Sequence, residues 1–344
     1  MSHSGPFRAH QSWTVLSGDE PLHAIMNRAD DRRTPSLGTM RAAGIVAFGA
    51  AITPLELPSP PEPRDGELLI DVQAAGVGPW DDIARRGEWD LGLRPPMALG
   101  VEAAGVVSAV GRSARFAIGD RVLTHSTPLR WQGAWAERFL TAADEAALLP
   151  GTVPFEVGAA FAVPALTADQ TVRDALSLGA GHTLLVHGAG GVTGGLVVQV
   201  AARLGARVIA TAGVRNTQRL LSAGADVVVD YHSPDWTRDV LAREDGAGVD
   251  AAVNAVPGGA ATALGVVRSG GALATITSDP PVAERGVRVH SVYVAPDGRR
   301  LQQLIDRLGS GELALSVAAR YPLEAAHDAL QARGAGGAVV LSAV

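Results

Sequence analysis

The sequence contains no cysteine, no lysine and few aromatic residues, and each absence excludes a class of chemistry. Without cysteine there is no disulfide, no thiolate nucleophile and no zinc site built on Cys ligands. Without lysine there is no Schiff-base or general-base amine, and all 29 basic residues are arginines. A bound phosphate must therefore be neutralised by arginine, histidine or backbone N–H groups.

A large positive charge and a long apolar run are absent as well. The formal net charge is −6, and no basic stretch provides the electrostatic footprint of a nucleic-acid-binding protein. No apolar stretch approaches the roughly 20 residues that span a bilayer. We therefore expect a soluble, cytoplasmic protein with no nucleic-acid or membrane partner. Its 344 residues, of which 47% are hydrophobic, are enough for roughly two domains.

Residues 1–39 are polar and irregular, and they contain no apolar segment of the kind found in a secretory signal. They carry acidic as well as basic residues, which does not fit a transit peptide. We expect a flexible N-terminal extension or a start codon placed too early, and an arm that covers the substrate is the alternative.

The hydrophobic pattern divides the rest of the chain into two kinds of structure. Residues 40–164 hold short apolar strands separated by Gly and Pro, which is typical of an antiparallel barrel or sandwich. Residues 165–284 alternate apolar strands with helical stretches, which predicts a parallel sheet with helices on both faces. Residues 285–344 return to a strand, a helix and a last strand, and we expect this segment to rejoin the first domain. The predicted fold class is α/β.

The stretch "HGAGGVTGGL", residues 187–196, lies between an apolar strand and a segment with helical spacing. Its glycines follow a G-x-x-G-x-x-G pattern formed by Gly188, Gly191 and Gly194. A strand-to-helix turn of this kind exposes helix N–H groups that bind a pyrophosphate, and glycine allows the backbone to approach the phosphate oxygens. A flexible connector is the alternative, but the strand, the helix and the second strand around the loop favour a dinucleotide site.

The end of the next strand indicates which dinucleotide is bound. An NAD site places Asp or Glu there to accept the ribose hydroxyls, but this chain has "TAGVRN" over residues 211–216, and its first carboxylate downstream is Asp226. Arg215 can pair with a 2′-phosphate through charge-assisted hydrogen bonds. The sequence therefore predicts NADPH rather than NADH. A solvated arginine in the first helical turn is the alternative interpretation of Arg215.

These motifs, in this order and spacing, make the chain resemble the zinc-independent quinone oxidoreductase branch of the medium-chain dehydrogenase/reductase superfamily. The resemblance is carried by "AAGVGPWDDIARRG", "LGVEAAGVVSAVG", "LTADQTV", the glycine loop and "AGADVVVDY", and it runs from about Met40 to the C-terminus. It implies a GroES-like β-barrel catalytic domain, a Rossmann cofactor domain and an active-site cleft where the two meet. It also implies a homodimer that moves hydride from NADPH to a quinone or to the C=C bond of an enone or enoyl thioester.

The resemblance assigns cofactor-binding roles to individual residues. Thr167 matches a position near the nicotinamide, and Val294 lies with Tyr293 where the chain re-enters the cleft. The other positions match the pyrophosphate loop, the 2′-phosphate pocket and the residues that pass under the cofactor, namely Gly188, Gly191, Val192, Thr193, Gly194, Thr211, Gly213, Arg215, Tyr231, Asn254 and Val256.

Several positions depart from the pattern of the relatives. Zinc alcohol dehydrogenases carry Cys and His where this chain has Gly78 and Val101, and Glu102 alone cannot hold zinc, so we expect no metal. Zinc-independent relatives usually have Asn at the position of Gly78, where its amide can orient the nicotinamide. Enoyl reductases place a Tyr, a candidate proton donor, near the position of Trp89. The cofactor site is therefore well matched, whereas the reacting end is altered.

The candidates for the reaction itself come from this altered end. Asp81 and Tyr293 are the candidate proton donors, and Gly78, Trp80 and Trp89 are expected to line the substrate pocket. A turn-capping role for Asp81 and a packing role for the aromatic residues are the alternatives, since quinone reduction can take its proton from solvent. The predicted function is NADPH-dependent reduction of a quinone or α,β-unsaturated carbonyl compound. A tailoring enzyme with a specialised polyketide-like substrate and a non-catalytic NADPH-binding sensor are the alternatives.

Overall fold

The computed structural model describes residues 38–332 and 336–343. Of the N-terminal extension predicted over residues 1–39, only Gly38 and Thr39 lie inside these ranges, and Thr39 is already the first residue of strand β1 (Thr39–Ile45). None of the helices in the described ranges combines the length and the apolar character that a bilayer-spanning segment needs.

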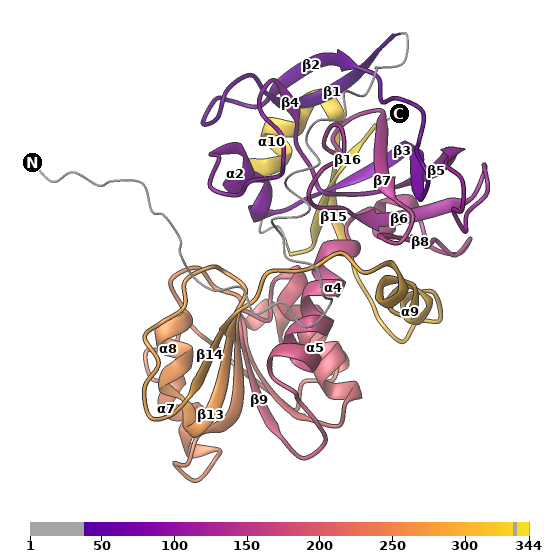
Figure 1. Ribbon diagram of the computed structural model, residues 1–344. Helices are drawn as coiled ribbons and strands as arrows, with labels where there is room; N and C mark the ends of the chain where they lie inside the picture. The colour runs from indigo at the N-terminus through magenta and orange to yellow at the C-terminus, as the bar shows by residue number, and fades with distance from the viewer. Residues whose placement is uncertain (1–37, 333–335, 344) are drawn as a thin grey trace, which may run out of the picture. The chain divides into compact units, whose positions relative to one another are not determined.

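Antiparallel pairing dominates the strands before residue 150, which form two sheets together with the end of the chain (Figure 1). Besides β1, their strands are β2 (Thr53–Pro58), β3 (Glu67–Val77), β4 (Met97–Ala98), β5 (Glu102–Val110), β6 (Arg121–His125), β7 (Arg138–Ala142), β8 (Ala146–Leu148), β15 (Val317–Pro322) and β16 (Ala338–Ser342). One sheet has the order β2–β1–β4. The other has the order β15–β16–β3–β5–β6–β8, and β7 also pairs with β3.

Strand β3 is almost completely buried because the apolar residues along it pack into three clusters, one of which contains Ala74. Leu68 and Ile70 belong to one cluster, and Val72 and Val77 belong to another. The C-terminal end of β3 pairs with the last strand of the chain, with Val339 opposite Val77. The residues that follow β3 are therefore held beside the last strand of the described chain.

Residues 183–291 contain a parallel sheet. Its strands are β9 (Thr183–His187), β10 (Arg207–Thr211), β11 (Val227–Val229), β12 (Val249–Asn254), β13 (Val267–Thr275) and β14 (Arg288–Ser291). They lie in the order β11–β10–β9–β12–β13–β14, and every neighbouring pair is parallel. This is the strand order of a doubly wound sheet, which binds ligands at the carboxyl ends of the strands where the order reverses. The predicted α/β class is confirmed.

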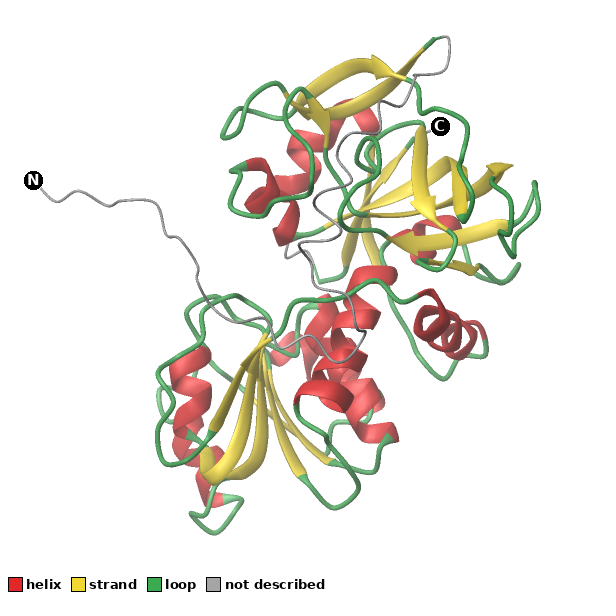
Figure 2. Cartoon of the chain, in the orientation of Figure 1, coloured by secondary structure: helices red, strands yellow, loops and turns green. Residues whose placement is uncertain are grey.

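Helices cover both faces of the parallel sheet (Figure 1, Figure 2). They are α4 (Ala162–Gln170), α5 (Val192–Arg203) and α6 (Thr217–Ser222) on one face, and α7 (Trp236–Ala242) and α8 (Ala260–Gly265) on the other. Alternation along β9 explains both layers, because Leu184 and Val186 join the cluster of α4 and α5 whereas Leu185 joins the cluster of α7 and α8. Each of these buried side chains contributes roughly 1.5–3 kcal/mol.

The parallel sheet extends beyond the predicted domain boundary at residue 284. Strand β14 pairs with β13, with Val289 opposite Leu273, although residues 285–344 were grouped with the first domain. The stretch "GVRVHSVYV" alternates like any half-buried edge strand, so its sequence does not show which sheet accepts it. After β14 the chain passes through α9 (Gly298–Gly309) before it forms β15 and β16.

Candidate active site

The glycine loop connects β9 to α5 at the carboxyl end of the parallel sheet. Gly188 has a φ of +88°, and a Cβ on it would lie 2.7 Å from Val256 Cγ2. A Cβ on Gly194 would collide with the carbonyl oxygen of Gly188. The packing of the loop therefore requires glycine at both positions.

Gly191, the N-cap of α5, differs because the packing of the protein does not require a glycine there. A Cβ on it would meet no atom closer than the Gly188 carbonyl oxygen, at 3.6 Å, and the residue is exposed. Val192 and Thr193 follow in the first turn of the helix and are half-buried. The missing side chain leaves the N–H groups of this helix end open to an anion, as a pyrophosphate site requires.

Thr211, predicted to line the 2′-phosphate pocket, is engaged inside the protein. Its side chain is 0% exposed, and its Oγ1 accepts the N–H of Gly188 (3.1 Å) and lies 2.8 Å from His187 Nδ1. The His187 ring stacks on Trp236 with centroids 4.9 Å apart, and burial lowers the pKa of His187. Thr211 therefore holds the first glycine of the loop in place from within the sheet.

Arg219 of α6 lies against the loop and was not predicted as a site residue. Its Nη2 donates to the carbonyl oxygen of Gly190 (2.9 Å) and to Asn216 Oδ1 (3.1 Å). A Cβ on Gly195 would lie 3.1 Å from its Nη1, so this glycine makes room for the guanidinium. Arg219 forms no ion pair with a carboxylate in the described ranges, and burial lowers its pKa. The signal in the sequence is its position one helical turn after Arg215.

Arg215 and Tyr231, both assigned to the 2′-phosphate pocket, are exposed. The Tyr231 ring stacks on His232 with centroids 4.1 Å apart, and His232 Cε1 would lie 3.3 Å from a Cβ on Gly213. The backbone N–H and the imidazole of His232 both bind Asp230 and lower its pKa. Gly213, Arg215 and Tyr231 are therefore neighbours at the carboxyl end of β10.

Asn254 and Val256 belong to a hydrogen-bonded turn after β12. The buried amide of Asn254 donates to the Val256 carbonyl oxygen (3.0 Å) and to Thr277 Oγ1 (2.8 Å). Asp279 accepts from Thr275 Oγ1 (2.7 Å) and Thr277 Oγ1 (2.5 Å). Burial acts to raise the pKa of Asp279, but these hydrogen bonds outweigh burial and hold it below its usual range. The network fixes Val256 against the first glycine of the loop.

The predicted reacting end follows β3, where helix α2 (Pro79–Arg85) begins. Asp81 is 1% exposed, and its Oδ2 accepts the N–H of Gly78 (2.8 Å), so it caps the turn that starts the helix. The indole ring of Trp80 occupies the space that a Cβ on Gly78 would need. Trp80 and Trp89 are both half-buried and pack against the same apolar cluster. These predicted residues are therefore brought together by the fold.

Glu102 and Asp81 form a buried pair of carboxyl groups. Burial raises the pKa of Glu102 well above its usual range, and the charge of Asp81 raises it further. Glu102 Oε2 accepts the N–H of Val163 in α4 (2.8 Å), and Thr167 Oγ1 donates to the Val163 carbonyl oxygen (2.7 Å). Asp81 therefore binds Gly78 and interacts electrostatically with Glu102, which binds the helix that carries Thr167.

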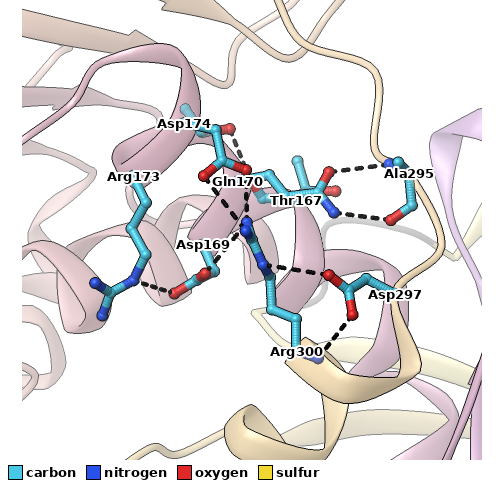
Figure 3. A network of polar contacts seen from close by, with 9 residues as sticks. Thr167, Asp169, Gln170, Arg173, Asp174, Ala295, Asp297 and Arg300 are labelled. Carbon is cyan, nitrogen blue, oxygen red and sulfur yellow. Dashed lines mark hydrogen bonds and ion pairs between the residues drawn. The ribbon is translucent and has the colours of Figure 1, made fainter. Parts of the chain in front are cut away.

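The segment of residues 292–295, on which two further predicted residues lie, is fixed at both ends. Val292 donates its N–H to the carbonyl oxygen of Thr275 (2.9 Å). At the other end, Gln170 Nε2 donates to the Ala295 carbonyl oxygen (2.8 Å) and Gln170 Oε1 accepts the Ala295 N–H (2.9 Å), as Figure 3 shows. Gln170 was not predicted, because a glutamine at a helix end carries no signal for such a contact.

Within this segment, Tyr293 is 61% exposed, whereas Val294 packs against the apolar clusters of both the parallel sheet and the β3 sheet. Arg300 lies beyond it and forms ion pairs with Asp169 (3.5 Å) and Asp174 (2.6 Å) of the α4 region (Figure 3). Burial acts to lower the pKa of Arg300, but its carboxylate partners outweigh burial and raise it. The charge of Arg300 is therefore paired with carboxylates, whereas Arg219 beside the glycine loop has no carboxylate partner in the described ranges.

Metal-ligating groups are sparse at the reacting end. In residues 38–332 and 336–343, no three or more His, Cys, Asp or Glu side chains are grouped so that they could hold a metal ion. Gly78 and Val101 offer no ligating side chain. The buried His125 has its Nδ1 3.1 Å from the Val101 carbonyl oxygen, and burial lowers its pKa to about 4. The absence of a resident metal stays a prediction.

Comparison with known proteins identifies the family. An alcohol dehydrogenase GroES-like domain matches residues 64–165, and a zinc-binding dehydrogenase model matches residues 223–340. The quinone oxidoreductase of Lama guanicoe is 31% identical over 325 residues, which are 88% of this chain and 97% of that protein. The chain belongs to the quinone oxidoreductase family. Membership confirms the predicted superfamily and an oxidoreductase with a GroES-like domain and a Rossmann-type NAD(P)-binding domain, acting on small molecules.

Two solved structures of the same fold are each 30% identical to this chain. Each match covers 88% of this chain and 99% of the chain in the solved structure. One is a NAD-dependent alcohol dehydrogenase with a TM-score of 0.78. The other is a mycobacterial protein complexed with NADPH, with a TM-score of 0.76. Because the two differ in nucleotide, the nucleotide of this chain has to be argued from its own residues.

Proposed function

We propose that this protein transfers hydride from NADPH to a quinone or an α,β-unsaturated carbonyl compound. The choice of nucleotide rests on Arg219 beside the glycine loop, whose guanidinium forms no ion pair with a carboxylate in the described ranges. Arg215 lies four residues earlier, and residues 211–216 hold no carboxylate that would repel a 2′-phosphate. The carboxylate of Asp230, which follows β11, is bound to His232.

The residues at the sheet edge fit NADPH as a bound group. The N–H groups of Val192 and Thr193 in the first turn of α5 suit its pyrophosphate, and the two arginines suit its 2′-phosphate. Gly213 and the exposed ring of Tyr231 suit its adenosine. When bound, NADPH supplies the hydride, and the protein supplies binding, orientation and exclusion of water.

The reacting end would hold the acceptor rather than activate it. Asp81 is engaged with the N–H of Gly78, and Glu102 is buried with its acid form favoured, so neither faces solvent as a proton relay. Trp80 and Trp89 offer flat apolar surfaces that suit a planar acceptor. Tyr293 is the candidate proton donor for an enone, and a quinone can take its protons from solvent.

We also propose a homodimer formed through the parallel sheets. Strand β14 is the outer strand of its sheet in the described ranges, and Arg288 and Ser291 on it are exposed. An open strand edge of this kind can pair with the same edge of a second copy. Light scattering that gives only the monomer mass would refute the dimer.

The function is tested by following NADPH absorbance with a panel of quinones, small enones and enoyl thioesters. We expect turnover of at least one simple quinone or enone, with NADH a poorer donor than NADPH. Tight NADPH binding without turnover of any acceptor contradicts the reductase and favours a non-catalytic sensor or a specialised tailoring enzyme. Comparable affinity for NADH and NADPH contradicts the choice of nucleotide.

A further inference from the structure

The indole N–H of Trp80 is a hydrogen-bond donor that the described residues leave unused. Its Nε1 is buried and has no partner in the described ranges. The ring edge next to this nitrogen lies in the space that a side chain on Gly78 would fill. Buried polar groups are almost always hydrogen-bonded, and a buried donor without a partner costs free energy. Such an atom therefore points to a partner outside the described residues, such as a bound molecule.

The position of Trp80 connects this donor with the proposed reaction site. Its chain neighbour Asp81 binds the N–H of Gly78 and is coupled to Glu102, which in turn binds α4. Trp80 also packs against the same apolar cluster as Val294, the residue that bridges to the parallel sheet. The donor thus lies among the residues that link the end of β3 with the cofactor domain.

We propose that the Trp80 N–H donates to a carbonyl oxygen of a bound molecule and so positions that molecule for reaction. An indole N–H is only a donor, so its partner must be an acceptor atom. Under the proposed function, on which this inference rests, two such oxygens enter the site: the nicotinamide carboxamide and the carbonyl of the quinone or enone. A hydrogen bond to the second strengthens as negative charge develops on that oxygen.

The test compares Trp80→Phe with Trp131→Phe. Phenylalanine keeps an aromatic side chain at position 80 and removes the N–H together with outer ring atoms that lie nearest Gly78. Trp131 is also half-buried, but its Nε1 donates to the Pro58 carbonyl oxygen (3.0 Å), so it is a matched control whose N–H already has a protein partner. For each variant we would measure the ligand-free melting temperature, NADPH and 2′,5′-ADP affinity by calorimetry, and kinetics with 1,4-benzoquinone.

Both variants lose part of a half-buried ring, which lowers stability, so we expect Trp80→Phe to lower the ligand-free melting temperature less than Trp131→Phe, which also loses a hydrogen bond. If the partner is the carboxamide, NADPH affinity falls about 3- to 10-fold and 2′,5′-ADP affinity stays unchanged. If the partner is the acceptor, NADPH affinity is unchanged and kcat/KM for benzoquinone falls by about the same factor. Trp131→Phe leaves binding and kinetics unchanged.

Two results would overturn the inference. A fall in the ligand-free melting temperature of Trp80→Phe as large as that of Trp131→Phe means that the Trp80 N–H has a partner inside the protein. Unchanged NADPH affinity together with unchanged kinetics means that no bound molecule uses it. Failure of the unmodified protein to oxidise NADPH with any acceptor instead contradicts the proposed function, while the calorimetric comparison still tests the carboxamide.

Discussion

Replacing Arg219 with glutamine tests the proposed nucleotide preference at its strongest point. The Nη2 of Arg219 is bound to Gly190 and Asn216, which leaves Nη1 and Nε as donors with no partner among the described residues. A hydrogen bond to a charged group contributes about 1.5–3 kcal/mol. Because the side chain is partly exposed and screened by solvent, we expect the lower end of this range, which is about a 10-fold loss of NADPH affinity.

The assay is calorimetric titration of Arg219→Gln with NADPH, NADH and 2′,5′-ADP at two salt concentrations. NADPH and 2′,5′-ADP should weaken together, NADH should be unchanged, and the loss should be smaller at high salt. Arg238→Gln is the control, since Arg238 is a highly exposed arginine paired with Asp235. Equal weakening of NADH and NADPH would refute the reasoning, because it would show that Arg219 only shapes the loop through Gly190.

Three further predictions follow from other contacts. Gly188→Ala should lower stability by at least about 1–2 kcal/mol because of its positive φ, whereas Gly191→Ala should weaken NADPH binding with stability nearly unchanged; urea unfolding and calorimetry separate them. The pKa of Glu102 is higher in the folded than in the unfolded protein, so its protonated form stabilises the fold fully at acid pH. This contribution is lost as pH rises from about 4.5 through the folded pKa, and the melting temperature falls with it. Glu102→Gln, which cannot ionise, should make that fall smaller. Gln170→Ala should lower stability by about 1–2 kcal/mol and raise acceptor KM, whereas Gln302→Ala, which loses an equivalent pair of backbone hydrogen bonds, should lower stability alone. The Glu102 prediction fails if Glu102→Gln has a lower melting temperature than the unmodified protein at neutral pH. The Gln170 prediction fails if Gln170→Ala and Gln302→Ala change the acceptor KM equally.

The glycine loop could be predicted from sequence because its signal is local. The strand, the glycines and the helix are consecutive, and the contact that requires Gly194 lies within the loop, whereas the contact at Gly188 is made by Val256 after β12. Arg219 could not be assigned in the same way, because its guanidinium reaches Gly190 across 29 residues of sequence. A pattern in the chain shows that an arginine is near the end of β10 but not which carbonyl oxygen holds it.

For Thr211, the position in the fold could be predicted from sequence, but its hydrogen-bond partners could not. Its position at the end of β10 was assigned correctly to the strand, and the resemblance gave it a role toward the 2′-phosphate. The structure shows its hydroxyl between His187 and the N–H of Gly188, with the side chain buried. Sequence gives the place of a polar residue in a fold, whereas the partner of its hydrogen bonds depends on the neighbouring strand.

The altered reacting end has a physical explanation that treats Gly78 and Trp80 together. A side chain at position 78 and an indole folded back from position 80 would occupy the same space, so Trp80 can take this position only because residue 78 is glycine. Considered alone, Gly78 lacks the amide of the Asn that related proteins usually have there, which could orient a ligand. Read together, a flexible amide is replaced by a rigid ring with one buried N–H, which loses less conformational freedom when it binds a ligand. Under the proposed function, a flat wall with a single donor suits planar carbonyl compounds, and the departure from the relatives then means a changed acceptor rather than a lost activity.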